Sequence, residues 1–154
     1  MSVATKTLYD TDFVEWSARM AQLLREGRFE EADLEHIAEE IEDLGKSDQS
    51  AVRSQLRRLL MHLIKQTIQP EKAGTSWRSS IVNARQEIDD KLEISPSLRR
   101  FLAEGLQKSY RRAVKDALEE TGLVSQAPEF QIPEICPYSL AELLESDLNT
   151  LWPR

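Results

Sequence analysis

The chain holds 154 residues, of which 40% are hydrophobic and 31% charged, a composition that fits one folded domain with a buried core. No run of residues approaches the ~18 consecutive apolar positions of a membrane span, and residues 1–13 lack the apolar segment of a signal peptide. We therefore expect a cytoplasmic protein with no membrane segment; the single cysteine, Cys136, cannot form an internal disulfide and suits that reducing compartment.

The net charge of −7 hides three blocks of opposite sign. Residues 1–50 hold five Lys/Arg and 13 Asp/Glu, a net charge of −8, whereas residues 51–115 hold 14 and six, a net charge of +8. Residues 116–154 return to −7. Such blocks can dock on each other, on a second copy of the chain or on an external polyanion. Internal or inter-subunit pairing is the simplest reading, and we expect a homo-oligomer, most simply a twofold dimer.

The first helix is predicted to begin after Asp12 and to end at Gly27. Asp12 is followed three positions later by Glu15, an Asp variant of the capping box. Gly27 suits the left-handed position that ends a helix. One face between these signals is apolar: Phe13, Trp16, Met20, Leu23 and Leu24.

The centre of the chain predicts one very long helix, from Leu34 to about Gln69, with Asp33 as its cap and Pro70 at its end. A straight helix of this length would span ~54 Å. That is longer than a compact chain of 154 residues can accommodate, because its radius of gyration should be ~15 Å. Either it breaks near Gly45, or it projects and pairs with another subunit; the unbroken phase favours a mild bend over a reversal. The apolar positions recur at steps of three and four, apart from one gap at Asp48: Leu34, Ile37, Ile41, Leu44, Val52, Leu56, Leu59 and Leu63.

Two further helices are predicted downstream. An apolar stripe from Trp77 to Leu92 indicates a helix over residues 76–93. Ser95 followed by Pro96 is a typical helix start, and the periodicity then continues to Gly122, a second C-terminal glycine.

The segment 123–138 contains three prolines and no regular period, so we expect an extended strap whose large apolar side chains (Phe130, Ile132, Ile135 and Tyr138) are buried. Ser139 and Glu142 form a capping box that opens a short last helix. No strand pattern is present. The predicted fold is an all-α multi-helix bundle, one domain over residues 1–154, with five or six helices around Trp16, Ile41, Leu59, Ile81 and Leu106.

Several segments, in order, resemble one family of bacterial proteins: LYDTDFVEW, DLEHIAEEIEDLGKS, RRLLMHLIKQ with QPEKAGTSWR, SPSLR, ETGL and CPYSL. Together they look like the family catalogued as domain of unknown function 29, over nearly the whole chain. The resemblance implies an all-helical fold. It gives no indication of an activity, and the cofactor stays unknown. One departure is Gln66, which stands where the family often has an aromatic residue after the Lys of its His-Leu-x-Lys string.

His36, Glu40 and Asp43 share one helix face and could bind a divalent metal. The Glu-x-x-His signature of di-metal bundles is absent, because Asp33 precedes His36 at that spacing and Leu59 precedes His62. A solvated or ion-paired acidic face explains the same residues.

A second candidate site lies at the end of the long helix. Pro70 and Gly74 favour a tight reversal, which would bring four side chains together: His62, Lys65, Trp77 and Arg78. Two cations, a flat apolar wall and an imidazole could bind an anionic ligand. The alternative is a half-buried histidine and an arginine, each paired with a carboxylate.

The basic middle offers a third possibility, because its arginines could follow a phosphate backbone: Arg53, Arg57, Arg58, Arg99, Arg100, Arg111 and Arg112. No nucleic-acid-binding signature accompanies them, and the flanking acidic blocks disfavour nucleic acid. No catalytic set converges in the sequence. We therefore expect a non-enzymatic interaction or regulatory module that could act with a protein partner. The alternatives are a metal-dependent enzyme that uses His36, Glu40 and Asp43 or a site at His62, and a nucleic-acid binder that uses residues 51–115.

Overall fold

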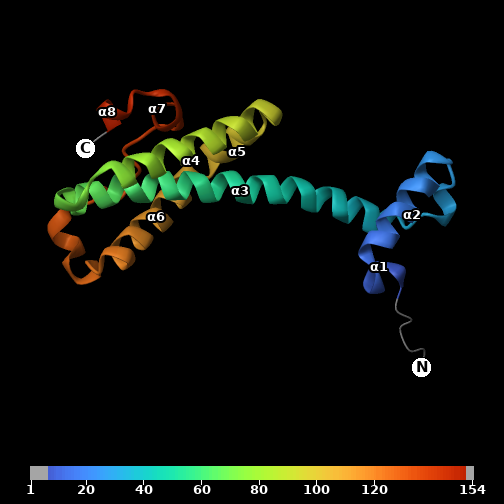
Figure 1. Ribbon diagram of the computed structural model, residues 1–154. Helices are drawn as coiled ribbons and strands as arrows, with labels where there is room; N and C mark the ends of the chain where they lie inside the picture. Colours follow the sequence, from blue (N-terminus) through green and yellow to red (C-terminus); the bar gives the residue numbers. More distant parts are fainter. Residues whose placement is uncertain (1–6, 152–154) are drawn as a thin grey trace. The chain divides into compact units, whose positions relative to one another are not determined.

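The computed structural model describes residues 7–151 (Figure 1), and this part of the chain is helical with no β-strand. None of its helices is long and apolar enough to cross a membrane. The expectation of no signal peptide rests partly on residues 1–6, which lie outside the described residues. The chain divides into two compact units, Met1–Lys46 and Ser47–Arg154, called here the N-terminal and C-terminal units. Each is described by itself.

The N-terminal unit contains α1 (Leu8–Thr11), α2 (Phe13–Arg25), the 3-10 helix η1 (Phe29–Glu31) and the beginning of α3. The predicted helix ends are confirmed: the Asp12 side chain accepts a hydrogen bond from the backbone N–H of Glu15, and Gly27 has a φ of +71°. The buried side chains are Trp16, Met20 and Leu23, with Leu8, Tyr9, Ala32 and Ile37 packed against them.

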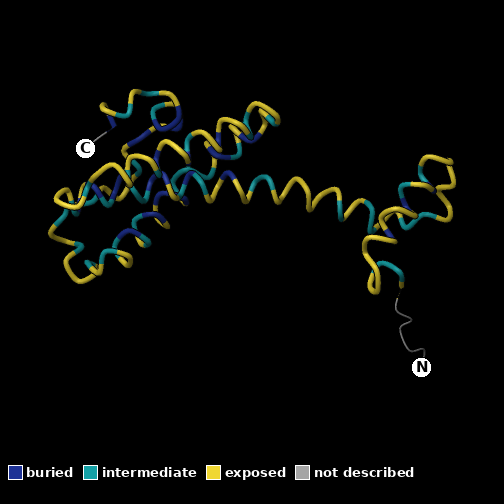
Figure 2. Tube along the Cα trace, in the orientation of Figure 1, coloured by how far each residue is buried: buried dark blue, intermediate teal, exposed yellow. Residues whose placement is uncertain are grey.

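The long helix α3 spans Leu34–Ile68, and Gly45 lies inside it. As predicted, Asp33 caps it, accepting a hydrogen bond from the backbone N–H of His36 at 3.2 Å. Figure 2 shows that buried residues concentrate in its second half, whereas Ile41 is 63% exposed. The expectation that Ile41 belongs to the core is therefore wrong, because no described element of its unit covers that side chain.

The C-terminal unit packs the rest of α3 with five helices: α4 (Thr75–Ile94), α5 (Leu98–Glu104), α6 (Leu106–Thr121), α7 (Leu140–Glu145) and α8 (Leu148–Leu151). A 3-10 turn, η2 (Pro70–Lys72), joins α3 to α4. Leu59 and Ile81 are fully buried in its core, as predicted, and Leu106 packs against it partly buried. Asp48, which interrupts the apolar stripe of α3, pairs with Lys91 of α4 at 2.9 Å.

The helix predicted from Ser95-Pro96 to Gly122 is two helices. Ser95 ends α4, and a turn precedes α5 at Leu98, so that the predicted cap and start positions are both displaced. At Gly105 the chain turns again before α6. Gly122 has a φ of +72° and ends α6 as predicted.

The segment after α6 begins with a 3-10 helix, η3 (Val124–Phe130), and continues without regular structure to the capping box of α7. Side chains of α6 hold this segment. Tyr110 donates to the carbonyl of Pro133 at 2.6 Å, and the Gln107 amide donates to the carbonyl of Glu134 and accepts from the backbone N–H of Cys136. The expectation of an extended, buried strap is therefore only partly right, and Ile135 is 76% exposed.

Candidate functional site

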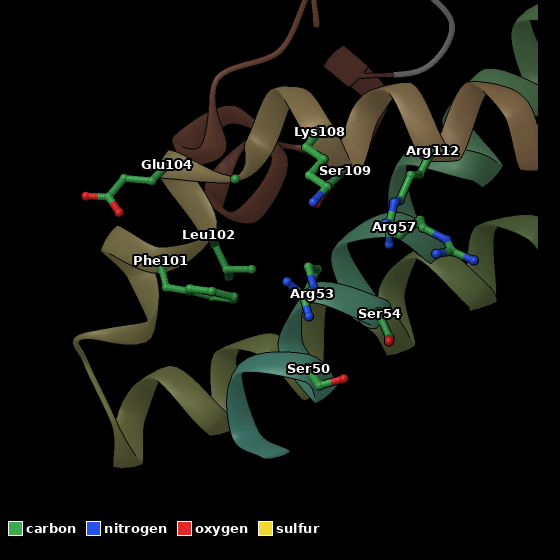
Figure 3. A pocket seen from close by; sticks show the side chains of 11 residues that line it. Ser50, Arg53, Ser54, Arg57, Phe101, Leu102, Glu104, Lys108, Ser109 and Arg112 are labelled. Atoms are coloured by element: carbon green, nitrogen blue, oxygen red, sulfur yellow. The ribbon is translucent and has the colours of Figure 1, made fainter. Parts of the chain in front are cut away.

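A basic pocket of about 480 Å³ lies in the C-terminal unit, between α3 and the pair α5–α6 (Figure 3). Its volume falls within the range of small-molecule sites. We call it the basic pocket and define it by its lining: Ser50, Arg53, Ser54, Arg57, Phe101, Leu102, Glu104, Gly105, Lys108, Ser109 and Arg112.

Helical periodicity places these residues. The α3 residues stand at steps of three, one and three (Ser50, Arg53, Ser54, Arg57), so they share one helix face. Serine is small, and its alternation with arginine leaves room for a ligand between the long side chains. On the other side, the turn at Gly105 separates α5 from α6, so that residues of both helices line the same cavity.

The electrostatics of the basic pocket favour an anion. Within residues 7–151, Arg53, Lys108 and Arg112 form no ion pair, whereas Arg57 is paired with Asp116 of α6 at 2.6 Å. The one acidic residue of the lining, Glu104, points away from the cavity (Figure 3) and lies 3.5 Å from Arg100. Three cations therefore face one cavity without a neutralising carboxylate.

Three further features prepare the pocket for a ligand. Ser109 is a polar side chain only 4% exposed, and it lines the wall where α6 begins. The N-terminus of α6 has no side-chain cap and adds the positive end of a helix dipole. Arg53 lies 5.5 Å from the centre of the Phe101 ring, a cation–π contact that orients the guanidinium.

The structure brings three of the four residues of the second predicted site together. The His62 and Trp77 ring centres lie 6.4 Å apart, and Lys65 Nζ lies 5.1 Å from the Trp77 ring. Lys65 also pairs with Glu120 at 3.3 Å. Arg78 is directed elsewhere: it is exposed and donates to the side-chain oxygen of Asn149 at 3.1 Å.

His62 is half-buried, and its Nδ1 has no hydrogen-bond partner in the described part of the chain. Burial lowers the pKa of His62 below 6.5, and the charge of Lys65 lowers it further. Gln66, one turn on, is 1% exposed, and its amide has no partner among the same residues. A ligand role for this group stays a prediction.

The proposed metal ligands His36 and Glu40 both contact Tyr9, and the ring of His36 stacks on the tyrosine ring at 4.1 Å, while Asp43 is exposed. His36 pairs with Asp33, and this hydrogen bond raises the pKa of the imidazole. Glu40 accepts a hydrogen bond from the Tyr9 hydroxyl, which raises the tyrosine pKa to about 12. Among residues 7–151, no three His, Cys, Asp or Glu side chains are grouped so as to hold a metal ion.

From the sequence, Arg53, Arg57 and Arg112 are predicted only as contacts for a phosphate backbone, and their convergence on one cavity is not predicted. The pattern Ser-x-x-Arg-Ser-x-x-Arg over residues 50–57 was a usable signal, because it marks one polar helix face with small gaps. Its meeting with α5 and α6 could not be read from spacing.

The family model described as "Domain of unknown function DUF29" matches residues 8–149. Comparison with curated proteins and with solved structures gave no match. The family match runs through both compact units and includes every residue of the basic pocket. The chain therefore belongs to the family of domain of unknown function DUF29.

Proposed function

We propose that the protein is a non-enzymatic binding module that recognises an anionic group in the basic pocket. The observation that carries this proposal is the set of three cations, Arg53, Lys108 and Arg112, that face one cavity without a carboxylate partner in the described residues. Arginine guanidinium groups bind phosphate and carboxylate through paired, charge-assisted hydrogen bonds.

The lining supports binding over catalysis. The basic pocket contains no histidine or cysteine, and its one carboxylate, Glu104, points away. The groups that face the cavity are cations and serine hydroxyls, which donate hydrogen bonds to an anion.

A compact anion fits better than a long nucleic acid. Asp116, Glu119 and Glu120 line an adjoining cavity that shares Ser54 and Arg57 with the basic pocket. These carboxylates interrupt the positive surface on that side and would repel a continuing phosphate backbone.

An NMR titration with inorganic phosphate tests the proposal, and Arg78 provides a matched control outside the pocket. Arg112→Gln should weaken phosphate binding by about tenfold or more, because it removes charge-assisted hydrogen bonds to the anion. Arg78→Gln removes the same charge and should leave the affinity unchanged. Weaker binding in Arg78→Gln, with Arg112→Gln unchanged, would place the anion at Arg78 and outside the basic pocket, and absence of binding would refute the function.

We also propose that the module acts as a homo-oligomer through the exposed face of α3 in the N-terminal unit. Leu34, Ile41 and Leu44 are 51%, 63% and 70% exposed. With Ile37 they repeat at steps of three and four, the spacing with which two helices pair along an apolar seam. A step of about 100° per residue places Glu35, Glu39 and Asp43 on the other side of the helix, so two copies can meet without opposing these carboxylates.

A further inference from the structure

The basic pocket has two chemically different ends. In Figure 3, Phe101 and Leu102 lie at one end, Arg57 and Arg112 lie at the other, and Arg53 stands between them. A ligand that fills both ends must therefore be charged at one end and apolar at the other.

The volume of the pocket supports such a ligand. A tetrahedral phosphate alone fills only a small part of about 480 Å³. The rest of the space is bounded by an aromatic face and a buried leucine, with Phe101 half-buried and Leu102 2% exposed. Aromatic side chains and arginine planes are the surfaces on which flat rings stack.

We propose that the ligand is a phosphomonoester that carries a flat aromatic ring, as in a free nucleoside monophosphate. Its phosphate binds Arg112 and Arg57, with Lys108 and Ser109 beside it, and its ring lies against Phe101 and Leu102. Arg53, held 5.5 Å from the Phe101 ring centre, contacts both parts of the ligand. This inference rests on the proposed function and adds the class of ligand to it.

Two phosphomonoester probes, one with a base and one without, test the ring. AMP should bind about five- to a hundredfold more tightly than ribose 5-phosphate, the range expected for one base stacked on an aromatic side chain. Equal affinities would overturn the aromatic ligand, while binding of inorganic phosphate in the same assay would leave the anion-binding function in place. Failure of all three probes would remove both proposals. Tighter binding of a peptide that contains phosphotyrosine would overturn the free nucleotide.

Two variants locate the ring and the phosphate. Phe101→Leu keeps an apolar side chain and should abolish the preference for AMP over ribose 5-phosphate. Phe130→Leu is the matched control, because Phe130 packs against the core outside the pocket. Arg112→Gln should weaken AMP and ribose 5-phosphate equally. A preference for AMP that survives Phe101→Leu would overturn the placement of the ring, and circular dichroism verifies that each variant is folded.

Discussion

Arg57 of α3 and Asp116 of α6 form an ion pair with 2.6 Å between the guanidinium Nε and a carboxylate oxygen. Arg57 lines the basic pocket, and Asp116 lines the adjoining acidic cavity. The pair therefore lies at the border between a positive and a negative surface. Asp116 neutralises part of the charge that Arg57 could offer to an anion in the pocket.

Asp116→Asn should strengthen phosphate binding by about two- to fivefold, because it frees Arg57 and removes a negative charge near the anion. The cost in stability should be below about 1 kcal/mol, since the pair is partly exposed. NMR titration and chemical denaturation measure the two effects. Weaker binding in Asp116→Asn would show instead that Asp116 positions Arg57 for the ligand.

Ile41→Glu should convert an oligomer to a monomer, because it places a charge in the apolar seam proposed for α3. Ile94→Glu is the control, since Ile94 is 80% exposed in the C-terminal unit and lies outside this seam. Light scattering over a range of concentrations gives the mass of each. A wild-type mass of 17.7 kDa at high concentration would contradict the homo-oligomer.

His62 should make the C-terminal unit less stable in acid. Its pKa is lowered in the folded protein by burial, so below about pH 6.5 the unfolded chain binds more protons, and the free energy of unfolding falls as the pH drops. His62→Gln should therefore lose less stability than the wild type between about pH 7 and about pH 5 in urea unfolding.

His36 provides the opposite case. Its pKa is raised by the hydrogen bond with Asp33, so its contribution to stability is present at low pH and is lost as the pH rises through the raised pKa. His36→Gln should therefore remove this contribution to the free energy of unfolding at low pH. Identical pH profiles for the wild type and both variants would show that neither histidine contributes.

Arg85→Leu should destabilise the C-terminal unit by about 2–3 kcal/mol, because a charged donor to buried carbonyls is lost. Arg85 donates to the backbone oxygens of Leu143 and Ser146 at 2.9 and 2.7 Å, and so satisfies the end of α7. Arg78→Ala, on the same helix, should change stability by less than about 0.5 kcal/mol, since Arg78 is exposed and bonds only one side-chain oxygen. Equal losses of stability in the two variants, measured by urea unfolding, would contradict this assignment.

We expect the N-terminal unit to open before the C-terminal unit. Three buried side chains (Trp16, Met20 and Leu23) form the core of its described part, which is too small for much independent stability. Hydrogen exchange should therefore show lower protection in α2 than in α6, and protection in α2 should rise with protein concentration if copies pair through α3. Uniform protection across both units would support the single cooperative domain expected from the chain length.

Much of the helical architecture could be predicted from the sequence because the signals are local. Asp12 and Ser139 cap helices through side chains that reach three residues along the chain, and Gly27 and Gly122 end helices through their own backbone conformation. The periodicity of α3 is equally local. The order of the segments that resemble the family can also be recognised in the sequence. It is enough to assign the family, but it indicates no activity.

Tertiary structure alone decided where the cations meet. The basic pocket is lined by residues 50–57 and by residues 101–112, and the two segments meet because the chain turns at Gly105. The apolar periodicity continues through Gly105, so the sequence does not predict this turn. Tertiary structure likewise decided that Arg85 donates to backbone carbonyls at the end of α7, whereas Arg78 donates only to a side-chain oxygen of α8, although both arginines lie on α4. Periodicity specifies which face of a helix is apolar, but only packing determines which neighbour covers that face and which side chains are left to face a cavity.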